Sequence, residues 1–573
     1  MTSYDTLRVT MGRKPIVVVD LLLDYCGNTF GVSPCTATGT KCYNTFATCG
    51  DKTNFNKQVK VYRLTTETSF LPTGEQIFPC ITDIDIAPTK LDWKGISLRA
   101  NIQITCKDFP YHDRGIDKYW AERSTGGTFF GKLKRRNPYV VNRLIKVRTG
   151  YVDDNRMVYT EDRTYFIDSI DGPDANGKVT IKAKDLLKLG DEDKSKAPAV
   201  NTGKLAGDLS ISDLTNIPID PVSALFEYPD SGYVRIGDEV IAYTGKSTNG
   251  LSGLTRAQFG TAADAHAKDD KVQWCLVYDN ARIEDVLYDL LVTYAAVPTE
   301  YIEFSDWIDE GQRWFGLWYF TGIISEPKGV NKLLEEIIDT TQIALWWDEV
   351  ASLIRFKAVR VPLSTDMPDT LTDSANLLAK SVQVIEREQD RVTRVEVYFG
   401  LIQAIDDIKK ENFRNLAIVV GSNEESDNAY GAVKTREVLT RWIDFDPHGD
   451  AVGRAILARY LNTPKEVTFR VDGKDASLRT GDYIDIRTRL TPDLSGADDT
   501  KRYIVTERRE VEAATHWEYK AQYVGETEHF ACVVGSATTP NYSSATSDDK
   551  NTYMYVSDDD GLVATGISGN LIM

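Results

Sequence analysis

The sequence predicts a mostly β, multidomain α+β protein. Its 573 residues exceed the roughly 250–300 residues at which a single hydrophobic core stops growing, so we expect about four domains. Apolar and polar residues alternate strictly over residues 96–106, as in a half-buried strand. Apolar residues recur with helical spacing only in a middle region, at residues 283–294 and 330–341.

The N-terminal part, residues 1–190, is expected to form a β-barrel domain. The apolar run at residues 16–23 follows Arg13 and Lys14 and superficially suggests a signal peptide, but Asp20 interrupts it and no small-residue cleavage site follows. We interpret it as a buried strand in a chain that folds in a reducing cytoplasm, where disulfides are rare. In the strand at 96–106, Cys106 falls on the core face as a small hydrophobe.

The remaining chain divides into four further segments. Residues 205–278 read as an inserted β domain, and residues 279–370 as an α/β domain in which two helices precede a hairpin at 343–359. Asn280 is the expected cap of the first helix. Residues 371–525 predict a second β-barrel, split by a helix at 447–461 that Asp446 and Pro447 open. Residues 526–573 form a polar C-terminal segment.

Charge and hydropathy exclude several classes of function. The formal net charge of −18 argues against sequence-specific nucleic-acid binding, because phosphates are contacted mainly by Lys and Arg. An acidic wall is still compatible with the passage of DNA, since repulsion prevents sticking, although solubility is the simpler explanation. No stretch approaches the roughly 20 apolar residues of a membrane span.

Four of the eight cysteines fall within 24 positions and indicate a metal site. Cys26, Cys35, Cys42 and Cys49 have the spacing C-x8-C-x6-C-x6-C, in a segment rich in Gly, Asn and Thr. Thiolates are soft ligands suited to zinc or iron–sulfur clusters, and structural zinc sites usually show closer C-x2–4-C pairs. The spacing alone leaves iron and zinc open. Cys80, Cys106, Cys275 and Cys532 are far apart and read as buried hydrophobes.

No catalytic motif is recognisable, and we predict that the protein is not an enzyme. The five histidines form no metal-binding pair at helical spacing, and phosphate-binding and nucleophile-elbow motifs are missing from the sequence. Asp306 and Asp309, near Trp307, Trp314 and Trp318, suggest a glycosidase or glycan-binding cleft as an alternative, although aromatic clusters are more often core. The basic run at 132–136 reads as a solvated loop or, more sharply, as a contact with an acidic neighbouring subunit.

Several segments resemble the tail-hub or tail-tip proteins of long non-contractile-tailed bacteriophages and gene transfer agents, a family that includes the tail tip protein L of phage lambda. The most specific is KCYNTFATCGDKTNF at residues 41–55, with the residues around Cys35 before it. The others are KDFPYHDRGIDKYW at 107–120, YVRIGDEVIAYTG at 233–245 with LTRAQFGTAADAH at 254–266, and NYSSATSDDKNTYMYVSDDDG at 541–561.

The resemblance implies a structural virion protein at the tail tip. It implies β-barrel hub domains interleaved with smaller α/β domains, in a homotrimer that closes the tail tube. Its partners would be the distal tail protein, the tape-measure protein and the central tail fibre. Each subunit would carry an iron–sulfur cluster, expected to be [4Fe–4S], on Cys26, Cys35, Cys42 and Cys49. A redox-sensing role of this cluster, and an opening of the hub during DNA ejection, are further conjectures.

Overall fold

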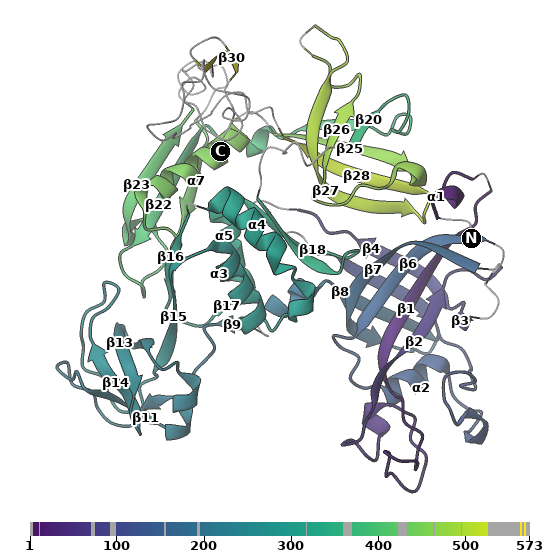
Figure 1. Cartoon of the computed structure of the whole chain (residues 1–573), viewed down its shortest axis with the longest axis horizontal. Coiled ribbons are helices and arrows are strands. Elements are labelled where there is room, and N and C mark those ends of the chain that lie inside the picture. Colours follow the sequence, from purple (N-terminus) through teal and green to yellow (C-terminus); the bar gives the residue numbers. More distant parts are fainter. Residues whose placement is uncertain are drawn as a thin grey trace, which may run out of the picture.

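The computed structural model describes residues 4–524 except 11, 70, 72–74, 92–98, 154–155, 192–194, 317, 359–368, 422–432, 462–463 and 494, and also residues 562–563 and 567–568. Over these residues the protein is mostly β and multidomain, with several sheets, a half-barrel and a few helices, which confirms the predicted fold class (Figure 1). No helix in the described part of the chain is long and apolar enough to cross a membrane.

An eight-stranded sheet forms the N-terminal half-barrel, in the order β3-β2-β1-β6-β7-β8-β5-β4. Its strands are β1 (Pro15–Cys26), β2 (Lys57–Thr65), β3 (Ile77–Phe78), β4 (Ile81–Ala87), β5 (Asn101–Lys107), β6 (Leu144–Asp153), β7 (Arg156–Asp171) and β8 (Lys178–Lys184). The short helix α1 (Tyr4–Leu7) precedes it. The buried strand predicted at residues 16–23 is confirmed as the central strand β1. Asp20 is tolerated there because Arg63 and Arg148 bind its carboxylate, at 2.8 and 3.1 Å.

Helix α2 (Phe129–Arg136) packs against the apolar face of this sheet through Phe129, Phe130 and Leu133. The interpretation of its basic run as a solvated loop is therefore wrong. Lys132 and Arg136 both bind the buried carboxylate of Asp113, at 3.0 and 2.8 Å. The apolar residues are spaced for only two turns of helix, too few to produce a clear period in the sequence.

Cys106 faces the core of the half-barrel, as its place in the alternating pattern predicted. Its side chain is buried with Ile102 and Ile104 of β5. The first part of the predicted strand, residues 96–98, lies outside the described residues. The C-terminal segment 526–573 also lies outside them, apart from β29 (Leu562–Val563) and β30 (Ile567–Ser568).

The next part of the chain forms a seven-stranded sheet in the order β10-β11-β14-β13-β12-β15-β16. Its strands are β10 (Lys204–Leu205), β11 (Asn216–Asp220), β12 (Gly232–Ile236), β13 (Glu239–Lys246), β14 (Gly250–Thr255), β15 (Gln273–Ala281) and β16 (Phe320–Ile324). A separate pair joins β9 (Lys196–Ala197) to β17 (Lys328–Gly329). Strand β15 continues from the inserted β region toward the central helices and so connects the two.

The central α/β region has the two helices and the hairpin predicted by periodicity. Its elements are α3 (Ile283–Asp289), which continues as a π-helical turn η5 (Leu290–Tyr294), α4 (Phe304–Phe315), α5 (Val330–Thr341), β18 (Ile343–Asp348) and β19 (Leu353–Ala358). Asn280 does not cap α3. It lies within β15, which runs to Ala281, and Arg282 occupies the N-cap position. Helix α4 was not predicted, because its residues were read as an aromatic cluster.

The C-terminal region contains a six-stranded sheet in the order β20-β26-β27-β28-β25-β21. Its strands are β20 (Asp369–Thr372), β21 (Gln383–Glu386), β25 (Lys465–Asp472), β26 (Tyr483–Arg487), β27 (Thr500–Glu512) and β28 (His516–Tyr523). Between β21 and β25 lie β22 (Arg394–Leu401), β23 (Phe413–Val420), β24 (Thr435–Leu439) and α7 (Asp446–Tyr460), and α7 packs on this small three-stranded sheet. Asp446 is the first residue of α7, with Phe445 at the N-cap.

A buried ionic cluster joins the first large sheet to the last. Arg163 of β7 pairs with Glu510 of β27, and Arg508 of β27 binds both carboxylate oxygens of Glu161 at 3.0 Å. The guanidinium of Arg508 also stacks on the ring of Trp517, 3.8 Å from its centroid. Because all four charged side chains are almost fully buried, each charge depends on its partner for compensation.

Glu510→Gln removes the negative charge opposite Arg163 and leaves that cation buried. We expect the free energy of unfolding to fall by about 3–5 kcal/mol. Chemical denaturation followed by tryptophan fluorescence measures this. Asp407→Asn is the matched control, because its partner Lys409 and Asp407 itself are both largely exposed, and it should change stability by less than about 1 kcal/mol. Equal effects of the two substitutions would contradict a role for the buried cluster.

Candidate functional site: the four-cysteine segment

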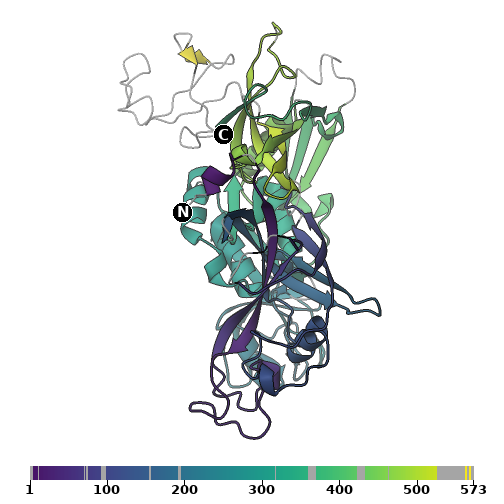
Figure 2. The ribbon, with the colours of Figure 1, turned by 90° about the vertical axis from the view of Figure 1, so that its right-hand side faces the viewer.

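The four cysteines lie in the connection between β1 and β2, at the end of the half-barrel farthest from the C-terminal sheet (Figures 1 and 2). Cys26 is the last residue of β1, is buried, and pairs in register with Lys57 of β2. Its amide donates to the carbonyl of Asn44 at 2.6 Å, which brings the middle of the connection back onto the strand end. The sheet therefore fixes the first thiol and the loops must supply the other three.

Turns rather than regular strands position Cys35, Cys42 and Cys49. The amide of Cys35 closes a turn onto Val32 at 2.9 Å, and Cys49 follows the short 3-10 helix η1 (Phe46–Thr48). Asp51 organises the two turns, since its carboxylate accepts hydrogen bonds from the amide and hydroxyl of Thr36, at 2.8 and 2.9 Å. These bonds, together with those from Asn54, lower the pKa of Asp51 to about 2.

The four thiols belong to one connection of the chain, between β1 and β2. Burial raises the pKa of Cys49, and the charges of Cys42, Cys26 and Cys35 raise it further, against the opposing effect of the Asp51 backbone contact. Each of the other three cysteines is thus within electrostatic range of Cys49. All four are free thiols rather than disulfides.

The chemistry of this donor set determines which group it fits. In the described residues no three His, Cys, Asp or Glu side chains are grouped closely enough to hold a single metal ion. Four thiolates on one zinc ion would lie roughly 3.8 Å apart, given Zn–S bonds of about 2.3 Å. In an iron–sulfur cluster each cysteine binds its own iron, so the sulfur atoms are spread around a larger group. Four free cysteines on separate turns of one connection are a donor set of the kind that such a cluster uses.

The cysteines outside this segment do not join it. Cys80, Cys106 and Cys275 are buried in apolar surroundings, as predicted for small hydrophobic residues, and burial raises the pKa of Cys275 to about 12. A hydrogen bond and burial likewise raise the pKa of Cys106 beside Cys80. Cys532 lies outside the described residues.

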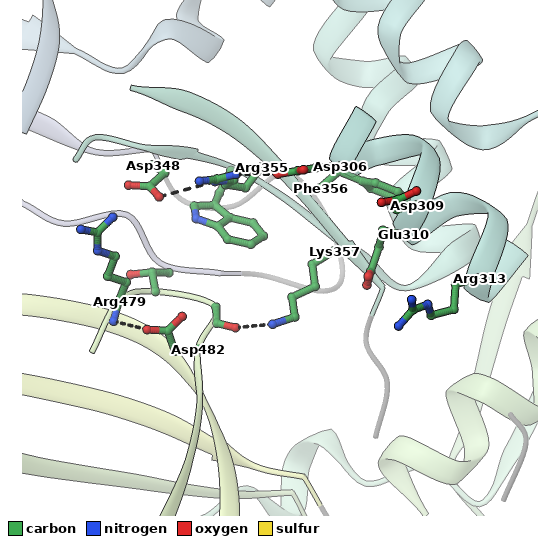
Figure 3. Close-up of a pocket in the computed structure, with 13 residues that line it drawn as sticks. Asp306, Asp309, Glu310, Arg313, Asp348, Arg355, Phe356, Lys357, Arg479 and Asp482 are labelled. Carbon is green, nitrogen blue, oxygen red and sulfur yellow. Dashed lines mark hydrogen bonds and ion pairs between the residues drawn. The ribbon is translucent and has the colours of Figure 1, made fainter. Parts of the chain in front are cut away.

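A cleft of about 460 Å3 lies between α4, the β18–β19 hairpin and the loop before β26 (Figure 3). Asp306 and Asp309 line it, as the glycan-binding alternative requires, but Asp306 is paired with Arg355 at 3.1 Å. Trp307 is only 2% exposed, and its Nε1 donates to the carbonyl of Ile354. Trp318 stacks on His448. Trp307 is therefore core rather than a platform for a sugar ring.

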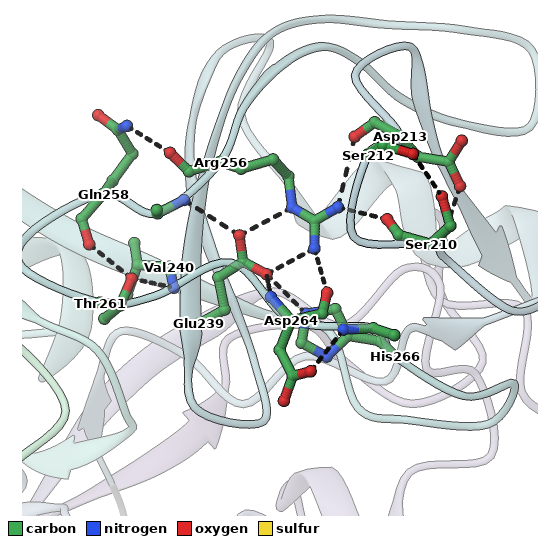
Figure 4. Close-up of polar contacts among 12 residues, drawn as sticks. Ser210, Ser212, Asp213, Glu239, Val240, Arg256, Gln258, Thr261, Asp264 and His266 are labelled. Carbon is green, nitrogen blue, oxygen red and sulfur yellow. Dashed lines mark hydrogen bonds and ion pairs between the residues drawn. The ribbon is translucent and has the colours of Figure 1, made fainter.

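A buried ionic cluster in the inserted β region joins residues 233–245 to residues 254–266, two segments that resemble the tail-hub family (Figure 4). Glu239 is 0% exposed and accepts from Arg256 Nε and Nη2 at 2.7 and 2.6 Å. His266 Nε2 lies 2.9 Å from the same carboxylate, which also accepts from the amides of Ala257 and Asp264. Glu239 thus anchors the connection between β14 and β15, which is a structural role.

Comparison with known proteins found similarity among solved structures. No family model matches it, and no curated protein sequence matches it. Among solved structures it is similar to the tail protein from Neisseria meningitidis MC58, with 10% identity, 77% of this chain and 92% of that chain covered, and a TM-score of 0.36.

Two further solved structures are similar. For the 43 kDa tail protein of prophage MuSo2 from Shewanella oneidensis the identity is 9%, the coverage 77% of this chain and 97% of that chain, and the TM-score 0.30. For a chain in the virion of a native gene transfer agent particle the identity is 18%, the coverage 43% of this chain and 47% of that chain, and the TM-score 0.28.

Glu239→Gln should destabilise the inserted β region by about 3–5 kcal/mol, because it leaves Arg256 buried without a counter-charge. Burial alone would raise the pKa of Glu239, but hydrogen bonds from Arg256 and His266 lower it below its usual value. The folded state therefore gains stability above the ordinary Glu pKa of about 4.3 and loses it as the pH falls further.

Hydrogen exchange of residues 232–266 between pH 7 and pH 3 measures both effects. Protection in the parent protein should fall at the acid end, whereas Glu239→Gln should be weakly protected throughout. Asp238→Asn changes the neighbouring carboxylate, which is exposed, and should behave like the parent protein. An unchanged profile for Glu239→Gln would refute the anchoring role.

Proposed function

We propose that this protein is a structural hub at the tip of a phage tail, with an iron–sulfur cluster on Cys26, Cys35, Cys42 and Cys49. The observation that carries the proposal is that four free cysteines lie in one connection at one end of the half-barrel, within the segment whose residues resemble the tail-hub family. The mostly β architecture, with sheets interleaved with a small α/β region, is compatible with that family.

The proposed cluster is a structural clamp. The connection between β1 and β2 spans 30 residues and contains only the short η1 as regular structure. It supplies few buried apolar side chains, so packing alone holds it weakly. When bound, the cluster would cross-link four points of this connection and so stabilise it, as metals do in other loop-rich segments.

The proposed assembly is a homotrimer that closes the tail tube. In this assembly the protein contacts the distal tail protein, the tape-measure protein and the central tail fibre. The argument for these partners is the sequence resemblance described above. A closed ring of identical chains is also the simplest way for one folded chain to end a tube, since each chain makes the same contacts.

We do not extend the proposal to catalysis or glycan binding. The tryptophan that would have formed a sugar platform, Trp307, is in the core, and the nearby Asp306 is engaged with Arg355. The role that we propose is mechanical, with no redox step.

Protein purified without oxygen should be brown, with broad visible absorption and stoichiometric iron and sulfide. Serine at any one of the four positions removes a thiolate ligand and should release iron and sulfide. Cys275→Ala is the control, because this buried cysteine lies outside the segment and should leave the iron content unchanged. A colourless protein that contains stoichiometric zinc and no iron would overturn the cofactor assignment.

Mass photometry tests the assembly. We expect a species of three chains, each of 64.2 kDa, either for the protein alone or after mixing with its tail partners. A protein that stays monomeric under both conditions would contradict the proposed hub.

A further inference from the structure

The cysteine segment is held in place by cations from residues 107–136. Arg123 Nη1 donates to the carbonyl of Lys41 at 2.9 Å, and Nη2 donates to the carbonyl of Cys42 at 2.6 Å. Lys118 Nζ donates to the carbonyls of Gly27 and Asn28, at 2.9 and 3.1 Å. Two cationic side chains therefore fix the backbone next to Cys26 and at Cys42.

Two arginines also sandwich one aromatic ring of the segment. The guanidinium carbons of Arg123 and Arg136 lie 4.1 and 4.2 Å from the centroid of Tyr43, the residue after Cys42. Thr45 adds a hydrogen bond from its hydroxyl to the carbonyl of Arg136 at 2.7 Å. The stack connects the cysteine segment to helix α2.

Buried carboxylates set the orientation of these arginines. Asp117 binds Arg123 Nε at 2.9 Å, and Asp113 binds Arg136 at 2.8 Å; both acidic side chains are buried. Partners of this kind, one step removed from the ligands, orient a metal site and tune it. The arginines are therefore fixed whether or not anything is bound to the thiols.

The local charge balance is opposite to that of the whole chain. Residues 26–60 and 107–136 together carry twelve Lys and Arg against five Asp and Glu, whereas the whole chain has 67 against 85. Four thiolates around a metal group carry excess negative charge, and nearby cations favour the charged form of such a group. Arg123, Arg136 and Lys118 are among these cations, and all three contact the cysteine segment.

We propose that Arg123 and Arg136, stacked on Tyr43, are positioning residues for a negatively charged, thiolate-bound metal group. They hold the Cys42 half of the segment against α2 and supply positive charge beside the group. This inference rests on the proposed function, because it assumes that the four cysteines bind a metal group.

The test compares Arg123→Gln and Arg123→Lys with Arg135→Gln in the full chain, purified without oxygen. Arg135 lies on α2 next to Arg136 and is exposed, so Arg135→Gln makes the same charge change away from the stack. Arg123→Gln should weaken iron retention against a chelator by about 10–100-fold, and Arg123→Lys should recover part of the loss. Arg135→Gln should match the parent protein.

The midpoint potential separates positioning from general stability. Reduction makes the group more negative, so loss of the Arg123 charge should lower the potential. Tyr43→Leu breaks the stack but keeps both arginine charges, and should weaken iron retention with a smaller change in potential. The inference would be overturned if Arg123→Gln and Arg135→Gln retained iron equally and had equal midpoint potentials. That result would leave the iron–sulfur assignment intact.

Hydrogen exchange of residues 41–49 in chelator-treated protein provides a measurement that needs no metal. Arg123→Gln should lose protection there relative to Arg135→Gln, because the carbonyls of Lys41 and Cys42 lose their donor. If the parent protein contains neither iron nor sulfide, the proposed cofactor fails, and this exchange difference alone decides the positioning role. Equal exchange in the two variants would then refute it.

Discussion

The structure depends on the buried contact between strand β7 and the C-terminal sheet. Arg163 and Glu161 of β7 are paired with Glu510 and Arg508 of β27, across 347 positions of sequence. The same strand also contacts the β18–β19 hairpin. Trp347 Nε1 donates to the carbonyl of Thr164 at 2.9 Å, and the amide of Thr164 donates to the carbonyl of Glu349. One strand therefore connects three regions, and their relative positions follow from it.

Elements whose buried face repeats regularly along the chain could be predicted from the sequence. Helix α5 and the β18–β19 hairpin agree with their predicted positions, because a buried helix face and a buried hairpin leave clear periods. Helix α2 was missed because it is short and basic. The pairing of Arg163 with Glu510 could not be predicted, since neither residue is distinguished from other charged residues of its strand in the sequence.

The sequence predicts four cysteine ligands for the candidate site, but it does not predict the side chains that surround them. The spacing of the four cysteines indicated a metal site, and the resemblance indicated iron and sulfur, which remains a prediction. Nothing in the sequence indicated that Arg123 would contact Cys42, 81 positions earlier. The only signal was the excess of Lys and Arg in residues 107–136. Likewise the segments that contain Glu239, Arg256 and His266 were singled out by the resemblance alone. The structure adds a physical role, because the three side chains form one buried cluster.

The N-terminal half-barrel is anchored in two separate regions: Glu161 and Arg163 midway along β7, and the cysteine segment that follows the end of β1 (Figures 1 and 2). The first region is held by buried ion pairs to the C-terminal sheet, and the second by hydrogen bonds and stacked arginines around the cysteines. Regions held by separate contacts open as separate cooperative units. If the cysteines bind a metal group as proposed, oxidation of the thiols would fray the cysteine segment while the junction of the three regions at β7 stays closed.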